Sequence, residues 1–349
     1  MERKMEVGIL GATGMVGQQF MLQLDRHPWF DVTWLGASQR SEGRRYAEAA
    51  PWRLASPMPD MVRDLVVEAA EPGRAPRLVF SALDAGVAGE IEAAFAAAGH
   101  IVVSNARNYR MDPVVPLLIP EINPDHLSLL DAQPAARGWS GRIVTNPNCS
   151  TVVLAMVLAP LRRFGIRRVM VSTMQAVSGA GYPGVASLDI LGNVIPFIDG
   201  EEEKIERETQ KILGAARQGA IAPHEMVVSA QTTRVPVANG HTEMVSIGFE
   251  TRPSEADLRE ALASFTGVPQ QLGLPSAPAQ PIVYLPERNR PQPGLDVQRG
   301  AGMTISVGRL RPCPIFDYKL VALGHNTVRG AAGAAVLNAE LMRAEGRLA

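Results

Sequence analysis

Residues 5–17 read MEVGILGATGMVG, and this stretch decides how the first part of the chain folds. Its apolar half, Met5–Leu10, predicts a short buried strand, and the apolar residues that follow recur at helical spacing. The turn between them has the pattern G-x-x-G-x-x-G, which differs from the usual G-x-G-x-x-G and alone is compatible with an ordinary turn. Between a strand and a helix, however, glycines let a pyrophosphate approach the backbone, and the helix N-terminus supplies N–H donors. The stretch therefore predicts a dinucleotide site.

The residues after the second expected strand, Val32–Ala37, indicate which dinucleotide binds. Enzymes that use NAD usually carry an acidic residue there, which holds the ribose 2′-hydroxyl. This chain instead has Ser38, Arg40 and Ser41, with no acid before Glu42. Hydroxyl groups and a guanidinium suit a 2′-phosphate, so we expect NADP rather than NAD; an ordinary solvated loop is the alternative.

Further short strands alternate with helical segments up to residue 148. We expect strands at Leu78–Ala82, Ile101–Val103 and Ile143–Thr145, and an alanine-rich helix over Val87–Ala98. Such alternation is typical of parallel strands joined by crossover helices, which predicts a Rossmann-like, doubly wound domain over residues 1–148. Such sheets bind ligands at the carboxyl ends of their strands, where this chain places Ser81, Ala82 and Asn105.

A cysteine follows the last of these strands, in the stretch TNPNCST at residues 145–151. Cys149 stands just before an apolar run, Val152–Leu161, that predicts a helix, and Ser150 and Thr151 are expected to cap its start. The positive end of a helix favours the thiolate, so Cys149 is expected to be a nucleophile. A buried cysteine that only fills space is the alternative, but it would be expected inside the apolar run.

The second half of the chain contains longer β-rich runs, at residues 168–177, 226–237, 241–251 and 303–311. Few helices separate them, which predicts a mixed, mostly antiparallel sheet covered by helices in an α+β domain. We expect residues 149–324 to form this catalytic and oligomerisation domain of a homodimer or homotetramer. The helix within residues 325–349 is expected to pack back on the first domain. The proline-rich segment 269–302 is expected to be a long excursion without an assigned chemistry.

Several polar features of this half indicate chemistry. Arg234 and His241 flank a strand that turns through Asn-Gly, and a histidine beside an activated cysteine is a natural proton carrier, although a structural histidine is the alternative. A glycine-rich loop at 178–184 either lets a ligand approach closely or is a flexible turn. Three glutamates at 201–203 open an amphipathic helix, where acids suit the helix dipole. Asn326 is expected either to reach the cofactor or to cap a helix.

Composition limits the class of protein. The chain has 349 residues, 46% of them hydrophobic, and a net charge of −1, so it can bury a large core and shows no preference for nucleic acid or anionic membranes. Two cysteines and the absence of an apolar run long enough for a signal peptide or a membrane span predict a cytoplasmic protein. No cysteine–histidine cluster has the spacing of a metal site, so no metal is expected.

Together these motifs resemble those of the aspartate-semialdehyde dehydrogenases, and specifically of their archaeal and fungal branch. The similar segments are Gly11–Gly17, Ser104–Met111, Asn146–Thr151, Gln175–Gly184, Glu201–Leu213, Arg234–Glu243 and Asn326–Gly333. They extend over essentially the whole chain. The resemblance implies an NADP-dependent reductive dephosphorylation of aspartyl phosphate to the semialdehyde, through a cysteine thioester, in the biosynthesis of lysine, threonine, methionine and isoleucine.

The resemblance also implies roles for individual residues. It makes Cys149 the acylated nucleophile, His241 the general acid and base, and Gln175 the residue that orients the thioester. The residues it assigns to the substrate are Arg234 for the carboxylate, Arg110 and Lys204 for the phosphate, Glu201 or its neighbour Glu202 for the amine, and Asn148. The residues expected around the cofactor are Gly11, Thr13, Gly14, Met15, Val16, Ser38, Arg40, Ser41, Ser81, Ala82, Asn105, Ser178, Gly179, Gly181 and Asn326.

Three other functions share part of this pattern. A malonyl-CoA reductase resembles the same branch and would use Cys149, His241 and NADPH, but its substrate has no amine for Glu201. An N-acetylglutamyl-phosphate reductase uses related chemistry and matches the motifs less well. A non-catalytic NADP-binding redox sensor would use Cys149 as an oxidisable thiol and would leave Gln175 and Arg234 without a role.

Overall fold

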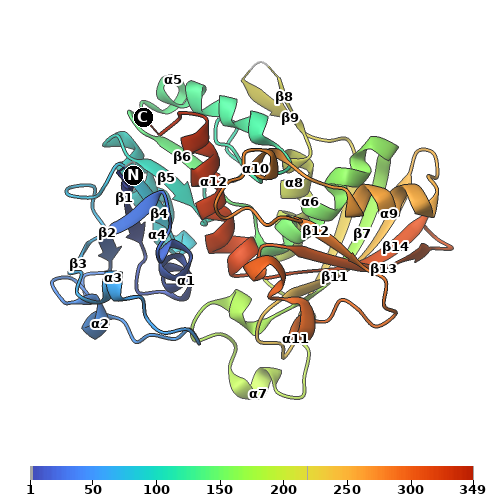
Figure 1. The fold of residues 1–349 in the computed structure, drawn as a ribbon, viewed down its shortest axis with the longest axis horizontal. Coiled ribbons are helices and arrows are strands. Elements are labelled where there is room, and N and C mark those ends of the chain that lie inside the picture. Colours follow the sequence, from blue (N-terminus) through green and yellow to red (C-terminus); the bar gives the residue numbers. More distant parts are fainter. Residues whose placement is uncertain (1–2, 218, 349) are drawn as a thin grey trace.

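The computed structural model describes residues 3–217 and 219–348, and two six-stranded sheets lie side by side in it (Figure 1). The first sheet has the order β3-β2-β1-β4-β5-β6, and all its strands are parallel. Its strands are β1 (Met5–Leu10), β2 (Phe30–Ala37), β3 (Val67–Ala69), β4 (Leu78–Ser81), β5 (Ile101–Ser104) and β6 (Arg142–Thr145). This order, with its reversal beside β1, is that of a doubly wound sheet.

Helices cover this sheet on both faces, which explains why its central strands are continuous apolar runs. The covering helices are α1 (Met15–Leu24), α4 (Ala85–Ala97) and the C-terminal α12 (Gly333–Ala344). Smaller helical elements are α2 (Tyr46–Ala49), α3 (Asp60–Arg63), α5 (Gln133–Arg137) and the 3-10 segment η1 (Pro124–Ala132). α12 is almost entirely buried and packs against α1 and β5, between the two halves of the molecule in Figure 1.

The second sheet has the order β10-β7-β11-β14-β13-β12, with parallel pairs at its two ends and antiparallel pairs between them. Its strands are β7 (Ile166–Gln175), β10 (Val227–Arg234), β11 (His241–Phe249), β12 (Ile282–Leu285), β13 (Ile305–Pro312) and β14 (Tyr318–Gly324). The predicted mixed, mostly antiparallel sheet beside a parallel one is confirmed. The sequence interpretation missed β3 and β14, and it was wrong about segment 269–302, which contributes the edge strand β12.

One face of this sheet is covered by helices, and the other face is open. α6 (Cys149–Leu161), α8 (Glu201–Ile212) and α9 (Glu255–Ala263) pack on the covered face, and α6 is so deeply enclosed that apolar residues surround its whole circumference. Minor elements of this half are η2 (Arg162–Phe164), η3 (Val177–Ala180), α7 (Ser187–Ile190), the hairpin β8 (Ala215–Arg217)–β9 (Ala220–Ala222), α10 (Val268–Gln271), α11 (Pro293–Asp296), η4 (Arg299–Gly302) and the π-helical η5 (Val328–Ala332).

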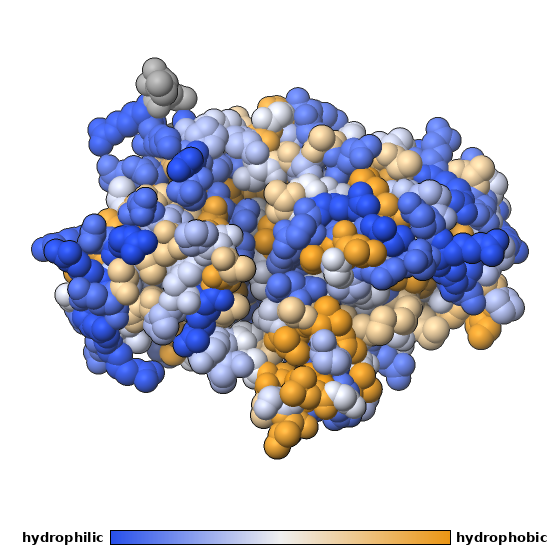
Figure 2. Space-filling view, turned by 60° about the horizontal axis from the view of Figure 1, so that its bottom comes forward, coloured by the Kyte–Doolittle hydropathy of each residue, from blue (hydrophilic) through white to orange (hydrophobic). Residues whose placement is uncertain are grey.

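An apolar arm, residues 182–197, projects from this half around α7 (Figure 1). Its large exposed side chains are those of Tyr182, Leu188, Leu191, Val194 and Phe197. They form the orange projection at the lower edge of Figure 2. Large apolar side chains are thus concentrated on this part of the surface.

Candidate active site

The cysteine helix α6 begins one turn earlier than the sequence predicts, because Asn148 is its N-cap. The Asn148 side-chain oxygen accepts hydrogen bonds from the backbone N–H groups of Ser150 at 2.9 Å and Thr151 at 3.2 Å. The prediction that Ser150 and Thr151 supply the cap was therefore wrong: they are capped, and their own hydroxyls have no partner among the described residues. Cys149 is consequently the first residue inside the helix.

His241, the first residue of β11, lies against this cysteine, with 3.2 Å between its Nε2 and the Cys149 sulfur. Its other ring nitrogen, Nδ1, is 3.1 Å from the backbone nitrogen of Ala176. Because a backbone N–H can only donate, Nδ1 must be the acceptor, and the neutral ring then carries its proton on Nε2. The imidazole thus presents an N–H donor to the sulfur.

Burial sets the protonation of this pair. It raises the pKa of Cys149 to about 12, reinforced by the Glu201 carboxylate and opposed by Arg110 and Arg234. It lowers the pKa of His241 to about 3, and the Arg234 charge adds to this effect. Desolvation therefore opposes the expected effect of the helix N-terminus, which favours the thiolate of Cys149.

The peptide of Ala176 positions a second residue of the site, Arg234, at the end of β10. The guanidinium of Arg234 is buried and donates to the Ala176 carbonyl oxygen at 2.8 Å. Gly179 fills the space between this guanidinium and the imidazole: a Cβ there would stand 2.8 Å from Arg234 Nη1 and 3.0 Å from His241 Cε1. A side chain at this position would displace one of the two. Gln175, at the end of β7, is buried and donates to Thr173 Oγ1 at 3.4 Å.

Helix α8 brings an ion pair to the other side of the cysteine. Glu201 accepts from the Asn148 side chain at 2.8 Å and from Lys204 at 3.1 Å. Burial alone would raise the pKa of Glu201, but Lys204 and Asn148 outweigh it and hold that pKa below its ordinary value. Glu202 instead accepts from the Thr232 backbone N–H, and Glu203 is exposed. Among the three glutamates, Glu201 is thus the one that faces the cysteine.

Arg110 lies in the same cluster and is buried. It donates to Glu208 at 3.0 Å and to the carbonyl oxygen of Asn105 at 2.7 Å. Its Nε–H has no partner among the described residues. Glu208 also accepts from the backbone N–H of Asn148 at 2.6 Å. The cluster therefore surrounds Cys149 with cationic groups that are held in place by carboxylates.

The glycine turn after β1 has the geometry of a phosphate cradle. Gly11 has a φ of +71°, and a Cβ on it would stand 2.6 Å from the carbonyl oxygen of Ala82. A Cβ on Gly17 would stand 2.4 Å from the Gly11 carbonyl oxygen. Helix α1 begins at Met15, and its N-cap residue Gly14 has no side chain that could cap it, which leaves the first N–H groups for an anion. The residues present thus fit the pyrophosphate of a dinucleotide.

The other residues expected around the cofactor differ in their burial and in their hydrogen-bond partners. Ser38 and Arg40 are exposed after β2, whereas Ser41 and Ser81 are buried. Asn105 is engaged on both sides: its nitrogen donates to the Ser81 carbonyl oxygen at 3.2 Å. Its oxygen accepts from Asn146 at 2.7 Å, a structural link that the sequence did not predict.

Asn326 neither caps a helix nor stands free. Its oxygen accepts from the Gly240 backbone N–H and its nitrogen donates to the Ser178 hydroxyl, each at 2.8 Å. It therefore joins the glycine-rich loop to the turn that precedes His241. Gly181, in the same loop, has a φ of +72°. Ser178, Gly179 and Asn326 are thus gathered beside the cysteine–histidine pair.

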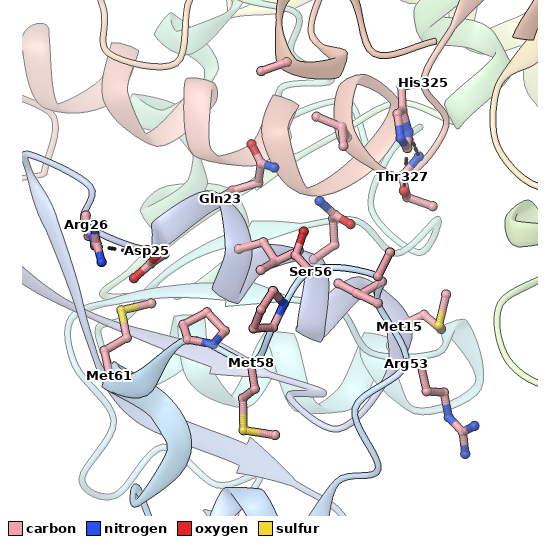
Figure 3. A pocket seen from close by; sticks show the side chains of 18 of the residues that line it. Met15, Gln23, Asp25, Arg26, Arg53, Ser56, Met58, Met61, His325 and Thr327 are labelled. Atoms are coloured by element: carbon pink, nitrogen blue, oxygen red, sulfur yellow. Dashed lines mark hydrogen bonds and ion pairs between the residues drawn. The ribbon is translucent and has the colours of Figure 1, made fainter. Parts of the chain in front are cut away.

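A cavity of about 930 Å³ opens along α1 (Figure 3). It is lined by residues of α1 from Met15 to Gln23, by Arg26 just beyond the helix and by residues of the segment 53–63. His325 and Thr327 also line it. Met15 is one of the residues expected around the cofactor. The other expected cofactor residues do not line this cavity, and neither does Cys149.

Within residues 3–217 and 219–348 no helix is long and apolar enough to cross a membrane. The same residues contain no group of three His, Cys, Asp or Glu side chains suited to a metal.

Comparison with known proteins identifies the family. The family models for the NAD-binding domain and the dimerisation domain of semialdehyde dehydrogenases match residues 6–130 and 158–329. The aspartate-semialdehyde dehydrogenase of Methanothermobacter thermautotrophicus is 53% identical over 96% of this chain and 98% of its own, and that of Archaeoglobus fulgidus 50% over 96% and 97%. The Candida albicans enzyme solved with NADP is 43% identical, with a TM-score of 0.91 over 99% of this chain and 100% of its own. The chain therefore belongs to the aspartate-semialdehyde dehydrogenase family, with relatives in its archaeal and fungal branch.

Proposed function

We propose that this protein reduces L-aspartyl 4-phosphate to L-aspartate 4-semialdehyde, with NADPH as the reductant and release of phosphate. The observation that carries the proposal is the Cys149–His241 pair, 3.2 Å apart, enclosed by Arg110, Arg234 and Glu201. A nucleophile beside a proton carrier performs acyl transfer, and the surrounding charges match a substrate with an amine, a carboxylate and a phosphate. Free thiols and NADPH both belong to a reducing compartment, so the proposal includes a cytoplasmic location.

The charges divide into three binding roles. Arg234 binds the substrate carboxylate, because a buried guanidinium forms two parallel hydrogen bonds with such a group. Arg110 and Lys204 bind the phosphate. Glu201 binds the ammonium, which explains why a carboxylate stands close enough to Cys149 to raise its pKa. Gln175 and Asn148 complete the proposed substrate site. A malonyl-CoA substrate has no ammonium and would leave Glu201 without a role in substrate binding.

Substrate binding also activates the nucleophile in this scheme. In the free protein, burial and the Glu201 carboxylate keep the Cys149 thiol protonated. A substrate ammonium next to Glu201 neutralises that carboxylate and thereby lowers the pKa of Cys149. The sulfur then attacks the acyl carbon as a thiolate: a C–S bond forms, the C–O bond to phosphate breaks with its electrons leaving on the phosphate, and the thiol proton departs with it as hydrogen phosphate.

The thioester on Cys149 is then reduced. NADPH, when bound by Gly11, Thr13 and the start of α1, supplies the hydride. His241 holds its proton on Nε2, next to the sulfur, and stabilises the charge that develops as the C–S bond breaks and the thiolate leaves. The ring position is fixed by the Ala176 N–H, so this donor needs no reorganisation during the reaction.

We also propose that the open face of the second sheet and the arm 182–197 form a subunit interface. On the open face Met170, Val227 and Met244 are 45%, 67% and 44% exposed, and the inward neighbours of these residues are buried. An exposed sheet face that carries large apolar residues is typical of a surface that a protein partner covers. Light scattering of the purified protein measures the oligomeric state, and a monomer at micromolar concentration would contradict the proposal.

The direct test is an activity assay in the oxidative direction. Purified protein is supplied with aspartate semialdehyde, NADP⁺ and phosphate, and a parallel sample receives malonyl-CoA and NADPH. The proposal predicts NADP⁺ reduction that requires both the semialdehyde and phosphate. Turnover of malonyl-CoA alone would assign the same cysteine chemistry to another substrate, and binding of NADP without any turnover would indicate a sensor.

A further inference from the structure

One face of α8 connects the cysteine helix to the loop that carries Arg110. The four residues of this face, Glu201, Lys204, Glu208 and Lys211, follow one another at intervals of three and four, so they lie on one side of the helix. Glu201 and Lys204 already belong to the proposed substrate site. Glu208 and Lys211 lie one and two turns deeper and are buried, and no step of the proposed reaction uses them.

Lys211 fixes the backbone of the Arg110 loop. Its ammonium donates to the carbonyl oxygens of Arg110, Asp112 and Val115 at 2.7, 2.8 and 2.9 Å. All three donors of the ammonium are thereby used. The loop therefore enters the site in a conformation that α8 determines.

Glu208 divides its two carboxylate oxygens between two parts of the site. Oε1 accepts from Arg110 Nη1 at 3.0 Å, and Oε2 accepts from the backbone N–H of Asn148 at 2.6 Å. Asn148 is the N-cap of α6 and directly precedes Cys149. Hydrogen bonds to an ionised carboxylate are short and strong, and a charge this deeply buried persists only with such partners. One side chain thus holds both the guanidinium and the start of the nucleophile's helix.

We infer that Glu208 is a positioning residue for phosphate binding: it sets Arg110 at a fixed place relative to Cys149, so that the guanidinium meets the phosphate of the acyl phosphate. The inference rests on the proposed function. Arg110 suits this role because Glu208 and Asn105 occupy only two of its five N–H groups. A guanidinium held at two points loses little further freedom when it binds phosphate, which increases affinity.

The test compares Glu208→Gln with Glu203→Gln, a matched change on the same helix at an exposed position. An amide oxygen replaces only one of the two carboxylate acceptors, and the amide N–H₂ faces a donor, so Arg110 or Asn148 loses its partner. We expect the KM for phosphate to rise about tenfold or more, because one charge-assisted hydrogen bond accounts for roughly that factor. The KM for NADP⁺ should stay within about twofold of that of the unmodified protein. Glu203→Gln should change neither constant.

A second readout does not depend on turnover. Phosphate that binds at Arg110 should protect Cys149 from alkylation by iodoacetamide, and the phosphate concentration that gives half-protection should rise in Glu208→Gln to the same extent as the KM. Two outcomes would show that Glu208 is only structural. One is a loss of stability with equal changes in the KM for phosphate and the KM for NADP⁺. The other is an unchanged KM and half-protecting concentration for phosphate. If Glu208→Gln does not fold, Glu208→Asp is judged by the same criteria, because it keeps the charge but is too short to reach both partners. Lack of phosphate-dependent turnover in the unmodified protein would instead contradict the proposed function itself.

Discussion

Two regions of the molecule are built in different ways. The cofactor crevice is the glycine turn Gly11–Gly17 with the start of α1 and the adjoining strand ends, and the cysteine site is Cys149 with the side chains around it. The crevice depends on the backbone: glycines with little room for a Cβ, an uncapped helix start, and strand ends brought into register by a parallel sheet. The cysteine site depends on side chains that come from distant parts of the chain and fix one another. Cys149 meets His241 from 92 residues away, and Arg110 meets Glu208 from 98 residues away.

This difference determines how each region responds to change. A site made of backbone N–H groups tolerates substitutions that keep the main chain in place, and it binds whatever carries the right phosphates. A site made of mutually paired buried charges loses several interactions when one member is removed, and the partners left behind are unpaired. We therefore expect substitutions around Cys149 to affect turnover strongly and substitutions around the crevice to affect binding moderately.

The largest expected effect comes from Cys149→Ser. A hydroxyl lacks the nucleophilicity and the leaving-group ability of a thiolate, so turnover should fall by about 10³-fold or more. The affinity for NADPH, measured by fluorescence titration, should stay within about twofold of that of the unmodified protein, because the crevice is formed by other residues. Retained turnover would exclude Cys149 as the nucleophile. A parallel loss of NADPH binding would show that the two regions are not independent.

The sequence predicted the strand, turn and helix of the crevice better than the side-chain contacts of the cysteine site, for the same physical reason. Strand, glycine turn and helix are local patterns, so Met5–Gly17 could be interpreted without knowing what lies opposite. The partners of Cys149 lie on β7, β10, β11 and α8, and spacing along the chain does not encode such contacts. The family resemblance placed His241 and Arg234, but no pattern indicated that the Ala176 peptide positions both of them. Nor did any pattern indicate that Glu208 links Arg110 to Asn148.

The protonation of Cys149 provides the next test. With its pKa near 12, the thiolate fraction rises about tenfold for each pH unit, so iodoacetamide should modify Cys149 about 10³-fold faster at pH 10 than at pH 7. Glu201→Gln removes the second largest cause of the raised pKa and should speed alkylation at pH 8 by about three- to tenfold. Glu203→Gln, at the exposed position on the same helix, is the control. A plateau in the rate near neutral pH would show that the free protein already holds a thiolate.

A smaller effect is expected in the crevice. Arg40→Ala should raise the Kd for NADP⁺ about tenfold, because one exposed guanidinium that pairs with a 2′-phosphate contributes about 1.4 kcal/mol. The Kd for NAD⁺ should not change, since NAD⁺ has no phosphate there. The measurement is a titration of both nucleotides against the same variant. Equal weakening of both would indicate that Arg40 acts on the loop rather than on the phosphate.

The smallest expected effect concerns Glu243, two residues beyond His241 on β11. Its side chain is fully buried, and neither carboxylate oxygen has a partner among the described residues. Burial, followed by the Glu201 charge, raises its pKa well above the ordinary 4.5. The folded protein therefore holds this proton at pH values where the unfolded chain has released it.

The sign of the resulting pH dependence follows from this difference in bound protons. Above pH 4.5 the folded state binds more protons than the unfolded state, so the free energy of unfolding falls as the pH rises towards the raised pKa. Glu243→Gln keeps the shape and removes the ionisation, so its stability should lose this slope and exceed that of the unmodified protein by about 1 kcal/mol at pH 8. Urea unfolding between pH 5 and pH 8 measures the difference. If the free energy of unfolding depends on pH in the same way in both proteins, the folded protein supplies the Glu243 carboxylate with a hydrogen-bond partner or a water molecule.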